Sequence, residues 1–290
     1  MVCDRLSVKR YYVDGRFGQI HYRLARPQRS TKLPLICLHM SPYCSVIYEN
    51  LIRELSSDRI CIAMDTPGFG GSDAPDFSPT IGDYALALKD FIDSLDFAEV
   101  DLLGYHTGGK IALEVAINFP DLVRKVILVS AAIWPAAQRE KLRALYSRSN
   151  ISHDGSHIVN WWKSAINWSM RGRSLESINK VFWSRTLNPE ISWWGHHAAI
   201  NYSTKIALQK VLHPVLVLNP EDDLWEHTAL AKALLTNPKS SVHDLPGWSH
   251  GFLDVKTEDG LIKPGKLDQK SVELIVDWLR REYTKSSIND

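Results

Sequence analysis

Apolar residues occur along the chain in two alternating patterns. Continuous apolar runs, which are typical of strands buried on both faces of a parallel sheet, occur at residues 33–39, 59–64, 100–103, 125–130 and 214–218. Segments with apolar residues on one helical face lie between or after them, at 46–55, 84–95, 228–235 and 271–283. This alternation predicts an α/β fold with a mostly parallel, doubly wound sheet and helices on both of its faces.

Two shorter patterns extend the predicted sheet at its edges. Residues 11–13 and 19–24 alternate between polar and apolar positions around Asp14-Gly15, which predicts a β-hairpin with an Asp-Gly turn at one edge. Residues 241–245 form the last predicted strand.

The strand pattern stops for about eighty residues after residue 132. We therefore expect a core made of residues 1–132 and 213–290, with a helical cap inserted as residues 133–212. The insertion is rich in tryptophan, with Trp134, Trp161, Trp162, Trp168, Trp183, Trp193 and Trp194. These rings either form the small core of the cap or line the inner face of a lid over an apolar substrate. We predict that Trp134 and Trp162 contact the substrate.

Composition and charge indicate which kinds of molecule the protein is expected to bind. The chain has 290 residues, 44% of them hydrophobic, and a net charge of +1 with no basic run. A near-neutral protein of this kind is not expected to bind nucleic acid or an anionic membrane. It has no apolar signal segment or membrane span, and its four cysteines lack the spacing of metal ligands. The sequence favours a cytoplasmic protein with free thiols that acts on a small molecule. It leaves open whether the protein forms a homodimer.

The most informative stretch is residues 100–114, where an apolar strand meets a helix at a turn rich in glycine. Gly104 and Gly108 lie two positions on either side of His106. This spacing is that of a nucleophile elbow, in which crowding forces the central residue into a strained conformation. The central residue of an elbow is ordinarily Ser, Cys or Asp. Here it is His106.

Four further segments, together with the elbow, make the chain similar to the α/β-hydrolase family with a helical cap. They are Leu38-His39-Met40-Ser41-Pro42, the loop Asp65-Thr66-Pro67-Gly68-Phe69-Gly70-Gly71-Ser72-Asp73, Asn219-Pro220-Glu221-Asp222-Asp223, and residues 245–252. The resemblance covers nearly the whole chain and keeps the family order of nucleophile, acid and histidine. It implies the fold but does not select the chemistry, which depends on the site.

The resemblance also implies a role for particular residues. Asp223, or alternatively its neighbour Asp222, would be the triad acid that accepts the Nδ1–H of His250. The backbone amides of Met40 and Thr107 would form the oxyanion hole.

Three residues near these positions are candidates for substrate contact. They are His39, Tyr105 and Trp248. His39 has a competing interpretation, because a histidine in this loop more often makes structural hydrogen bonds.

Three interpretations of His106 remain open. In the first, its imidazole is a general base or a nucleophile, kept largely neutral by the positive end of the following helix and by His250. In the second, His106, His250 and Asp223 bind Zn or Fe. In the third, the protein only binds a small apolar ligand. Displacement of the nucleophile to Thr107 or Cys44 is the least favoured alternative.

The first interpretation leads to our expectation of function. We expect hydrolysis of a small apolar or aromatic carbonyl substrate (an ester, amide or activated C–C bond) by a His-Asp-His variant of the catalytic triad, without cofactor or metal. A lyase or isomerase that uses His106 as its base is the alternative. Without Asp at the elbow, the mechanisms of haloalkane dehalogenases and epoxide hydrolases lack their nucleophile, so we expect neither.

Overall fold

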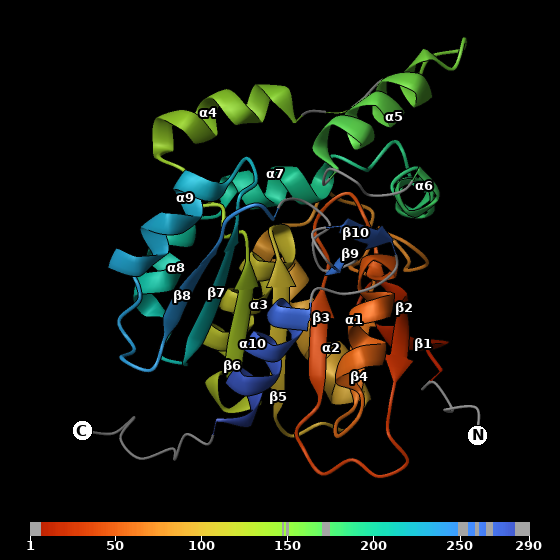
Figure 1. The fold of residues 1–290 in the computed structure, drawn as a ribbon. Coiled ribbons are helices and arrows are strands. Elements are labelled where there is room, and N and C mark those ends of the chain that lie inside the picture. Colours follow the sequence, from red (N-terminus) through yellow and green to blue (C-terminus); the bar gives the residue numbers. More distant parts are fainter. Residues whose placement is uncertain are drawn as a thin grey trace.

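A computed structural model describes residues 7–146, 148, 151–169, 175–248, 255–258, 261–264 and 269–281. Its centre is an eight-stranded sheet with the order β1-β2-β4-β3-β5-β6-β7-β8 (Figure 1). The strands are β1 (Lys9–Gly15), β2 (Gly18–Ala25), β3 (Leu35–Leu38), β4 (Cys61–Met64), β5 (Val100–Tyr105), β6 (Val123–Val129), β7 (Val215–Pro220) and β8 (Ser241–Leu245). Pairing is antiparallel for β1–β2 and β2–β4 and parallel elsewhere. The mostly parallel sheet predicted from the sequence is confirmed.

The predicted hairpin is present, but its turn lies two residues later than expected. Asp14 and Gly15 belong to the ladder, where they pair with Gln19 and Gly18. The two residues between Gly15 and Gly18 therefore make the connection. Gly18 has φ +105, a conformation that glycine adopts without steric cost, so Gly18 rather than Gly15 allows the chain to reverse.

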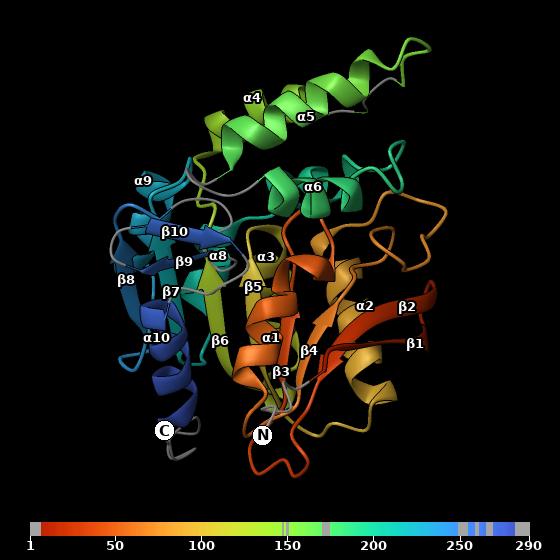
Figure 2. The ribbon, with the colours of Figure 1, turned by 45° about the vertical axis from the view of Figure 1, so that its right-hand side comes forward.

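Helices cover both faces of the sheet (Figures 1 and 2). On one face lie α2 (Ile81–Ser94), α3 (Thr107–Asn118) and α8 (Thr204–Lys210), which share a hydrophobic cluster. On the other face lie α1 (Glu49–Leu55), preceded by the 3-10 helix η1 (Ser45–Tyr48), and α10 (Gln269–Arg280). The remaining elements are η2 (Pro120–Leu122), α9 (Trp225–Ala229), η3 (Leu230–Ala233) and an antiparallel ribbon of β9 (Val255–Glu258) and β10 (Leu261–Pro264).

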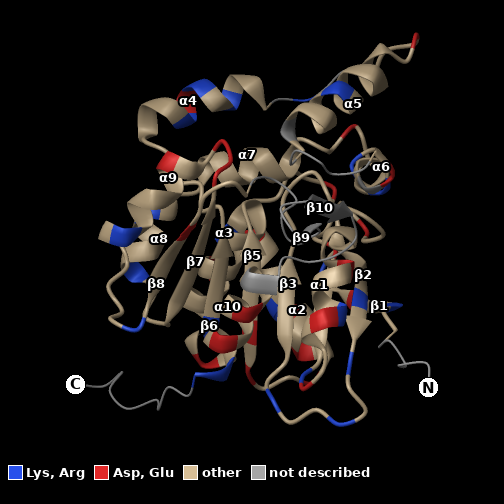
Figure 3. Cartoon of the chain, viewed as in Figure 1, with Lys and Arg blue, Asp and Glu red and all other residues tan. Residues whose placement is uncertain are grey.

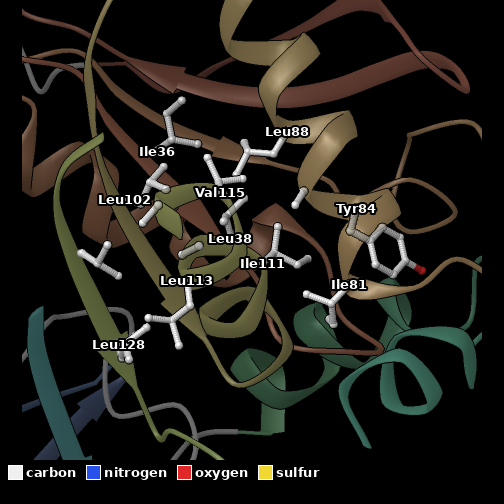
Figure 4. Packing of buried hydrophobic residues seen from close by; sticks show 14 of the residues in the cluster. Ile36, Leu38, Ile81, Tyr84, Leu88, Leu102, Ile111, Leu113, Val115 and Leu128 are labelled. Carbon is white, nitrogen blue, oxygen red and sulfur yellow. The ribbon is translucent and has the colours of Figure 1, made fainter. Parts of the chain in front are cut away.

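The core between the sheet and α2 and α3 fixes the position of the elbow. Figure 4 shows strand residues such as Leu102 and Leu128 packed against Leu88 of α2 and Ile111 and Val115 of α3. All five are at most 2% exposed. Burial of one such side chain contributes about 1.5–3 kcal/mol, so α3 is held firmly against the strand that precedes it.

The segment between β6 and β7, which the sequence predicts to be a cap, forms helices. Its helices are α4 (Ala136–Leu145), α5 (Ser156–Trp168), α6 (Leu175–Ser184) and α7 (Trp194–Asn201). They lie beyond the ends of β5 and β6 that lead into α3 and the cap (Figures 1 and 2). Helix α8 follows α7 but packs with α3 in the core. The predicted domain boundaries at residues 133 and 212 stay a prediction.

Charged residues of both signs lie on the outer helices and turns, whereas the central strands are mostly uncharged (Figure 3). Among the described helices, none is long and apolar enough to cross a membrane.

Candidate active site

His106 occupies a sharp turn between β5 and α3. Its backbone has φ 48 and ψ −108, a region that non-glycine residues rarely adopt. Its N–H donates to the carbonyl of Val129 (3.1 Å), and its own carbonyl accepts from the N–H of Gly109 (3.0 Å). A Cβ atom on Gly108 would lie 2.1 Å from the Leu38 carbonyl oxygen. The glycine is required because α3 approaches β3 too closely for any side chain.

A buried carboxylate lies beside the imidazole of His106. Oδ2 of Asp222 is 3.6 Å from Nε2 of His106, and the Asp222 side chain is fully buried. The hydroxyl of Ser130 donates to Oδ2 (2.6 Å), and the N–H of Leu224 donates to Oδ1 (2.8 Å). These donors compensate for part of the solvation that the carboxylate loses on burial. The ends of β5, β6 and β7 thus bring His106, Ser130 and Asp222 together.

Asp223, the predicted triad acid, is exposed and influences residues of the cap. Burial and then the charge of Asp223 raise the pKa of Tyr146. The charge of Asp223 also acts on His196 of α7. His250 lies outside the described residues, so the bond between Asp223 and His250 stays a prediction.

The loop after β3 is braced by His39, which is 1% exposed. Its Nδ1–H donates to the carbonyl of Met40 (3.0 Å), and its Nε2 accepts from the N–H of Thr66 (2.9 Å). Burial lowers the pKa of His39, against the opposing charge of Asp65 and the hydrogen bond to Met40. A neutral imidazole is therefore bonded at both nitrogens. This is the structural role that the sequence also allowed, and contact between His39 and substrate stays a prediction.

The two amides expected in the oxyanion hole come from neighbouring segments. The carbonyl of Met40 also accepts from the N–H of Tyr43 (3.0 Å), which together with His39 fixes the course of the loop. Thr107 is the first residue of α3. Its N–H belongs to the first turn, where amides lack partners within the helix. The oxyanion hole itself stays a prediction.

The loop after β4 is organised by the buried carboxylate of Asp65. Nδ1 of His21 and the N–H of Gly71 bond Oδ2 (2.7 and 2.9 Å), while the N–H of Ser45 bonds Oδ1 (2.6 Å). Burial alone would raise the pKa of Asp65, but these hydrogen bonds, led by that of His21, outweigh it, so the pKa is lowered. Asp65 thereby ties this loop to the segment that follows the His39 loop.

The predicted aromatic contacts lie in different surroundings. The ring of Tyr105 is buried and meets the ring of His106 edge-on at 4.8 Å. Trp134 lies against the amino group of Lys110 (5.1 Å). Trp162 packs edge-to-face with Phe182 (5.1 Å) within a small cluster of the cap. Trp248 packs against the core on the α1 and α10 face. Their contacts with substrate stay predictions.

The structure adds two cap residues that the sequence interpretation missed. The rings of Tyr146, at the end of α4, and His196, on α7, stack at 4.4 Å with an angle of 14°. Burial, together with the charges of His106 and Arg185 and against that of Asp223, lowers the pKa of His196 to about 3. The pair therefore lies within electrostatic reach of His106. The available signal was the pair of adjacent histidines, His196 and His197, in a segment of apolar and aromatic residues.

In the part of the chain that the structure describes, no group of three or more His, Cys, Asp or Glu side chains is placed to hold a metal ion. The metal interpretation includes His250, which lies outside that part, so this finding does not test it.

Comparison with known proteins finds one family and several relatives. The family described as alpha/beta hydrolase fold matches residues 34–256. Haloalkane dehalogenase 2 of Mycobacterium tuberculosis is 32% identical over 126 residues, which make up 43% of this chain and 43% of that protein. Epoxide hydrolase 4 of Mus musculus is 32% identical over 114 residues, 39% of this chain and 31% of that protein. The chain thus spans less than half the length of these two curated relatives.

Solved structures extend the likeness over nearly the whole chain. A thermophilic esterase from Thermogutta terrifontis, solved with malate bound, has a TM-score of 0.70 and 19% identity. The match covers 94% of this chain and 98% of the esterase chain. At this level of identity the comparison shows a shared fold, and the chemistry has to be argued from the site.

Proposed function

Because the chain belongs to the alpha/beta hydrolase fold family, we propose that it is a hydrolase of a small apolar or aromatic carbonyl substrate: an ester, an amide or an activated C–C bond. The observation that carries this proposal is the pair formed by His106 and the buried Asp222, with 3.6 Å between Nε2 and Oδ2. The pair stands where the elbow presents the reacting side chain.

The position of Asp222 assigns roles to the two imidazole nitrogens. We propose that Nε2 carries a proton that faces the carboxylate and that Nδ1 acts as the base during the reaction. The positive end of α3 disfavours a cation at His106, and the nearby carboxylate of Asp222 is proposed to stabilise the imidazolium only as it forms during the reaction.

Ester hydrolysis then proceeds with His106 as general base. Nδ1 takes a proton from water while the water oxygen bonds to the carbonyl carbon. The amides of Met40 and Thr107 donate to the carbonyl oxygen as it gains charge. The imidazolium returns the proton to the leaving oxygen as the C–O bond breaks, which yields an acid and an alcohol and regenerates the imidazole.

His250 and Asp223 complete the proposed site in a supporting role. His250, with Asp223 as its acid, is proposed to hold the attacking water or the leaving group on the side opposite Asp222. The His-Asp-His variant of the triad thus uses two imidazoles, of which His106 performs the proton transfer.

Hydrolysis of a short-chain nitrophenyl ester by metal-stripped protein tests the proposal. We expect His106→Ala to lower kcat by about 10²–10⁴-fold, the usual contribution of a general base, and Asp222→Asn to lower it similarly. Asp223→Asn tests the supporting role of Asp223 separately, and we expect it to lower kcat less than Asp222→Asn does. An unchanged rate in folded His106→Ala would contradict the proposal. Activity toward none of the esters would direct attention to lyase or isomerase chemistry.

A further inference from the structure

The chain passes between core and cap at two crossings, which lie side by side. It leaves β6 through residues 130–134 and returns through residues 202–204 into α8. Both crossings contact Lys110, which lies one helical turn after His106 on α3 and is 2% exposed.

The amino group of Lys110 bonds one group from each crossing. Nζ donates to the carbonyl of Ala132 (3.0 Å) and to the hydroxyl oxygen of Thr204. The Thr204 hydroxyl donates in turn to the carbonyl of Ala132 (2.9 Å). Three segments far apart in the sequence therefore share one closed set of hydrogen bonds.

Aromatic rings from the same crossings enclose the ammonium. Nζ lies 5.1 Å from the ring centre of Trp134 and 5.9 Å from that of Tyr202, which are distances of cation–π attraction. The hydroxyl of Tyr202 donates to Glu114 (2.8 Å), one further turn along α3. The exit and the return of the cap are thus both fastened to the helix that begins at His106.

A cavity of about 10 Å³ connects this fastening to the proposed active site. It is lined by His106 and Lys110, together with Ala131, Ala132 and Thr204. Its volume is about that of a single water molecule. His106 and three residues of the fastening therefore line the same space.

We propose that Lys110 is a positioning residue whose amino group fastens both crossings to α3 and thereby sets how the cap lies over His106. The hydrogen bonds of Lys110 are present whatever reaction the protein catalyses. Their effect on catalysis rests on the proposed function.

The charge state of Lys110 makes the fastening depend on pH. The ring of Tyr202 faces Lys110 from the second crossing, and the charge of Arg139 on α4 acts on it. Burial, and then the charge of Arg139, lower the pKa of Lys110 to about 7. The lowered pKa means that burial disfavours the ammonium, so opening of the crossings takes up a proton between pH 7 and the usual pKa of 10.5. The fastening is therefore weaker below about pH 7 and becomes more stable as the pH rises through that value.

Hydrogen–deuterium exchange of the intact protein measures the fastening without reference to activity. Lys110→Met removes the amino group and keeps an apolar side chain of similar length. Thr204→Val removes the shared hydroxyl with little change of shape. The matched control is Lys125→Met, because Lys125 is also a buried lysine but donates to the carbonyls of Trp278 and Leu279 at the end of α10.

At pH 6 we expect Lys110→Met and Thr204→Val each to raise exchange several-fold at residues 131–134 and 202–206. The double variant should show no further increase, because both changes open the same set of bonds. Lys125→Met should raise exchange near residues 276–281 instead. At pH 8.5, after correction for intrinsic rates, the wild-type protein should exchange more slowly at these residues than at pH 6, so its difference from Lys110→Met should widen. Unchanged exchange at both crossings in the two single variants, or a rise equal to that in Lys125→Met, would overturn the proposal.

Ester kinetics supply the second readout. If Lys110 positions the cap, KM of the wild-type protein should fall several-fold from pH 6 to pH 8.5, and KM of Lys110→Met should be high at both values. A wild-type KM that does not change with pH would overturn the link to catalysis while leaving the exchange result intact. If no ester is hydrolysed at all, the proposed function fails, and the exchange experiment still decides whether the fastening exists.

Discussion

His106 adopts a strained backbone conformation at the turn that leads into α3. Its φ of 48 with ψ of −108 belongs to the sparsely populated conformations that cost about 1–3 kcal/mol in a residue with a Cβ atom. Gly104 and Gly108 surround it because the neighbouring backbone leaves no room for side chains. The turn keeps this strain because the side chain of His106 has to project from it.

A matched pair of variants measures this strain. Ala keeps the Cβ atom, whereas Gly removes it at an entropic cost of about 0.5–1 kcal/mol in the unfolded chain. We expect His106→Gly to be more stable than His106→Ala by about 1 kcal/mol, the reverse of the usual order. Urea unfolding at pH 7 gives both free energies. A more stable His106→Ala would mean that the surroundings have relaxed the turn.

At the scale of single residues, sequence interpretation located the sharp turn at His106 but gave no sign that Asp222, the alternative to the predicted acid Asp223, lies beside it. The glycine spacing around His106 was sufficient to locate the turn. Asp222 and Asp223 are adjacent, and the course of one turn decides that Asp222 is buried beside His106 while Asp223 is exposed. No pattern of apolar residues records a difference of one position in a loop.

The loop after β4 shows how one side chain stabilises a whole element. Asp65 accepts hydrogen bonds from three different segments, at His21, Ser45 and Gly71. A Cβ atom on Gly70 would lie 2.0 Å from the Asp65 carboxylate, so the glycine at that position is needed for the backbone to close around it. The loop is therefore stabilised by the hydrogen bonds that the buried Asp65 carboxylate accepts.

We expect Asp65→Asn to lower the free energy of unfolding at pH 7 by about 2 kcal/mol, the size of a hydrogen bond to a charged group. The pKa of Asp65 is lowered from 3.8 in the folded protein. Its contribution is therefore complete above pH 3.8 and is lost as the pH falls through the lower folded pKa. Urea unfolding between pH 3 and pH 7 should show this loss in the wild-type protein and not in Asp65→Asn.

Asp73→Asn is the control for that experiment. Asp73 lies in the same loop and accepts from the N–H of Gln19 (2.7 Å), but it is exposed. Solvent screening limits what an exposed carboxylate contributes. An effect of Asp73→Asn as large as that of Asp65→Asn would contradict the role assigned to burial.

Sequence interpretation was most successful for elements whose burial pattern is continuous. The five apolar runs all became strands because each is covered on both faces. The ribbon of β9 and β10 was missed, although Asp259-Gly260 stands between its strands. The same dipeptide was given too much weight near the N-terminus, where the turn follows Gly15. An Asp-Gly pair marks a region of turning but not its exact register.

At the scale of the whole molecule, the cap brings Tyr146 and His196 from two helices to one place above the core. We expect His196→Ala to raise KM for aromatic esters about fivefold, which corresponds to the loss of about 1 kcal/mol of ring stacking, with little change in kcat. Because the pKa of His196 is about 3, the ring is neutral from pH 5 to pH 8, and this effect should not vary with pH over that range.

His197→Ala is the control for the stacked pair. His197 is the next residue on α7, but its ring lies against Trp193 at 5.2 Å. Steady-state kinetics with esters of benzoate and acetate should show a KM effect for His196→Ala that is larger with the aromatic ester. Equal effects of the two histidines would indicate a general disturbance of the cap.

The helical nature of the insertion could be predicted from its pattern, but its arrangement over the core could not. The side chains that orient the cap, such as Lys110, lie in core elements whose sequence gives no sign of a distant partner. Lys110 bonds Thr204, which is 94 positions away, and local periodicity carries no information about such pairs.

The insertion of the cap between β6 and β7 also determines how the chain can fold as it is synthesised. When β6 leaves the ribosome, its outer edge has no neighbour until β7 follows more than eighty residues later. The cap therefore emerges while the sheet is still open. Closure waits for the last helix, because Lys125 of β6 bonds carbonyls of Trp278 and Leu279 more than 150 positions away. Contacts of such long range form slowly, so the nascent chain presents an unpaired strand edge, a surface that chaperones shield.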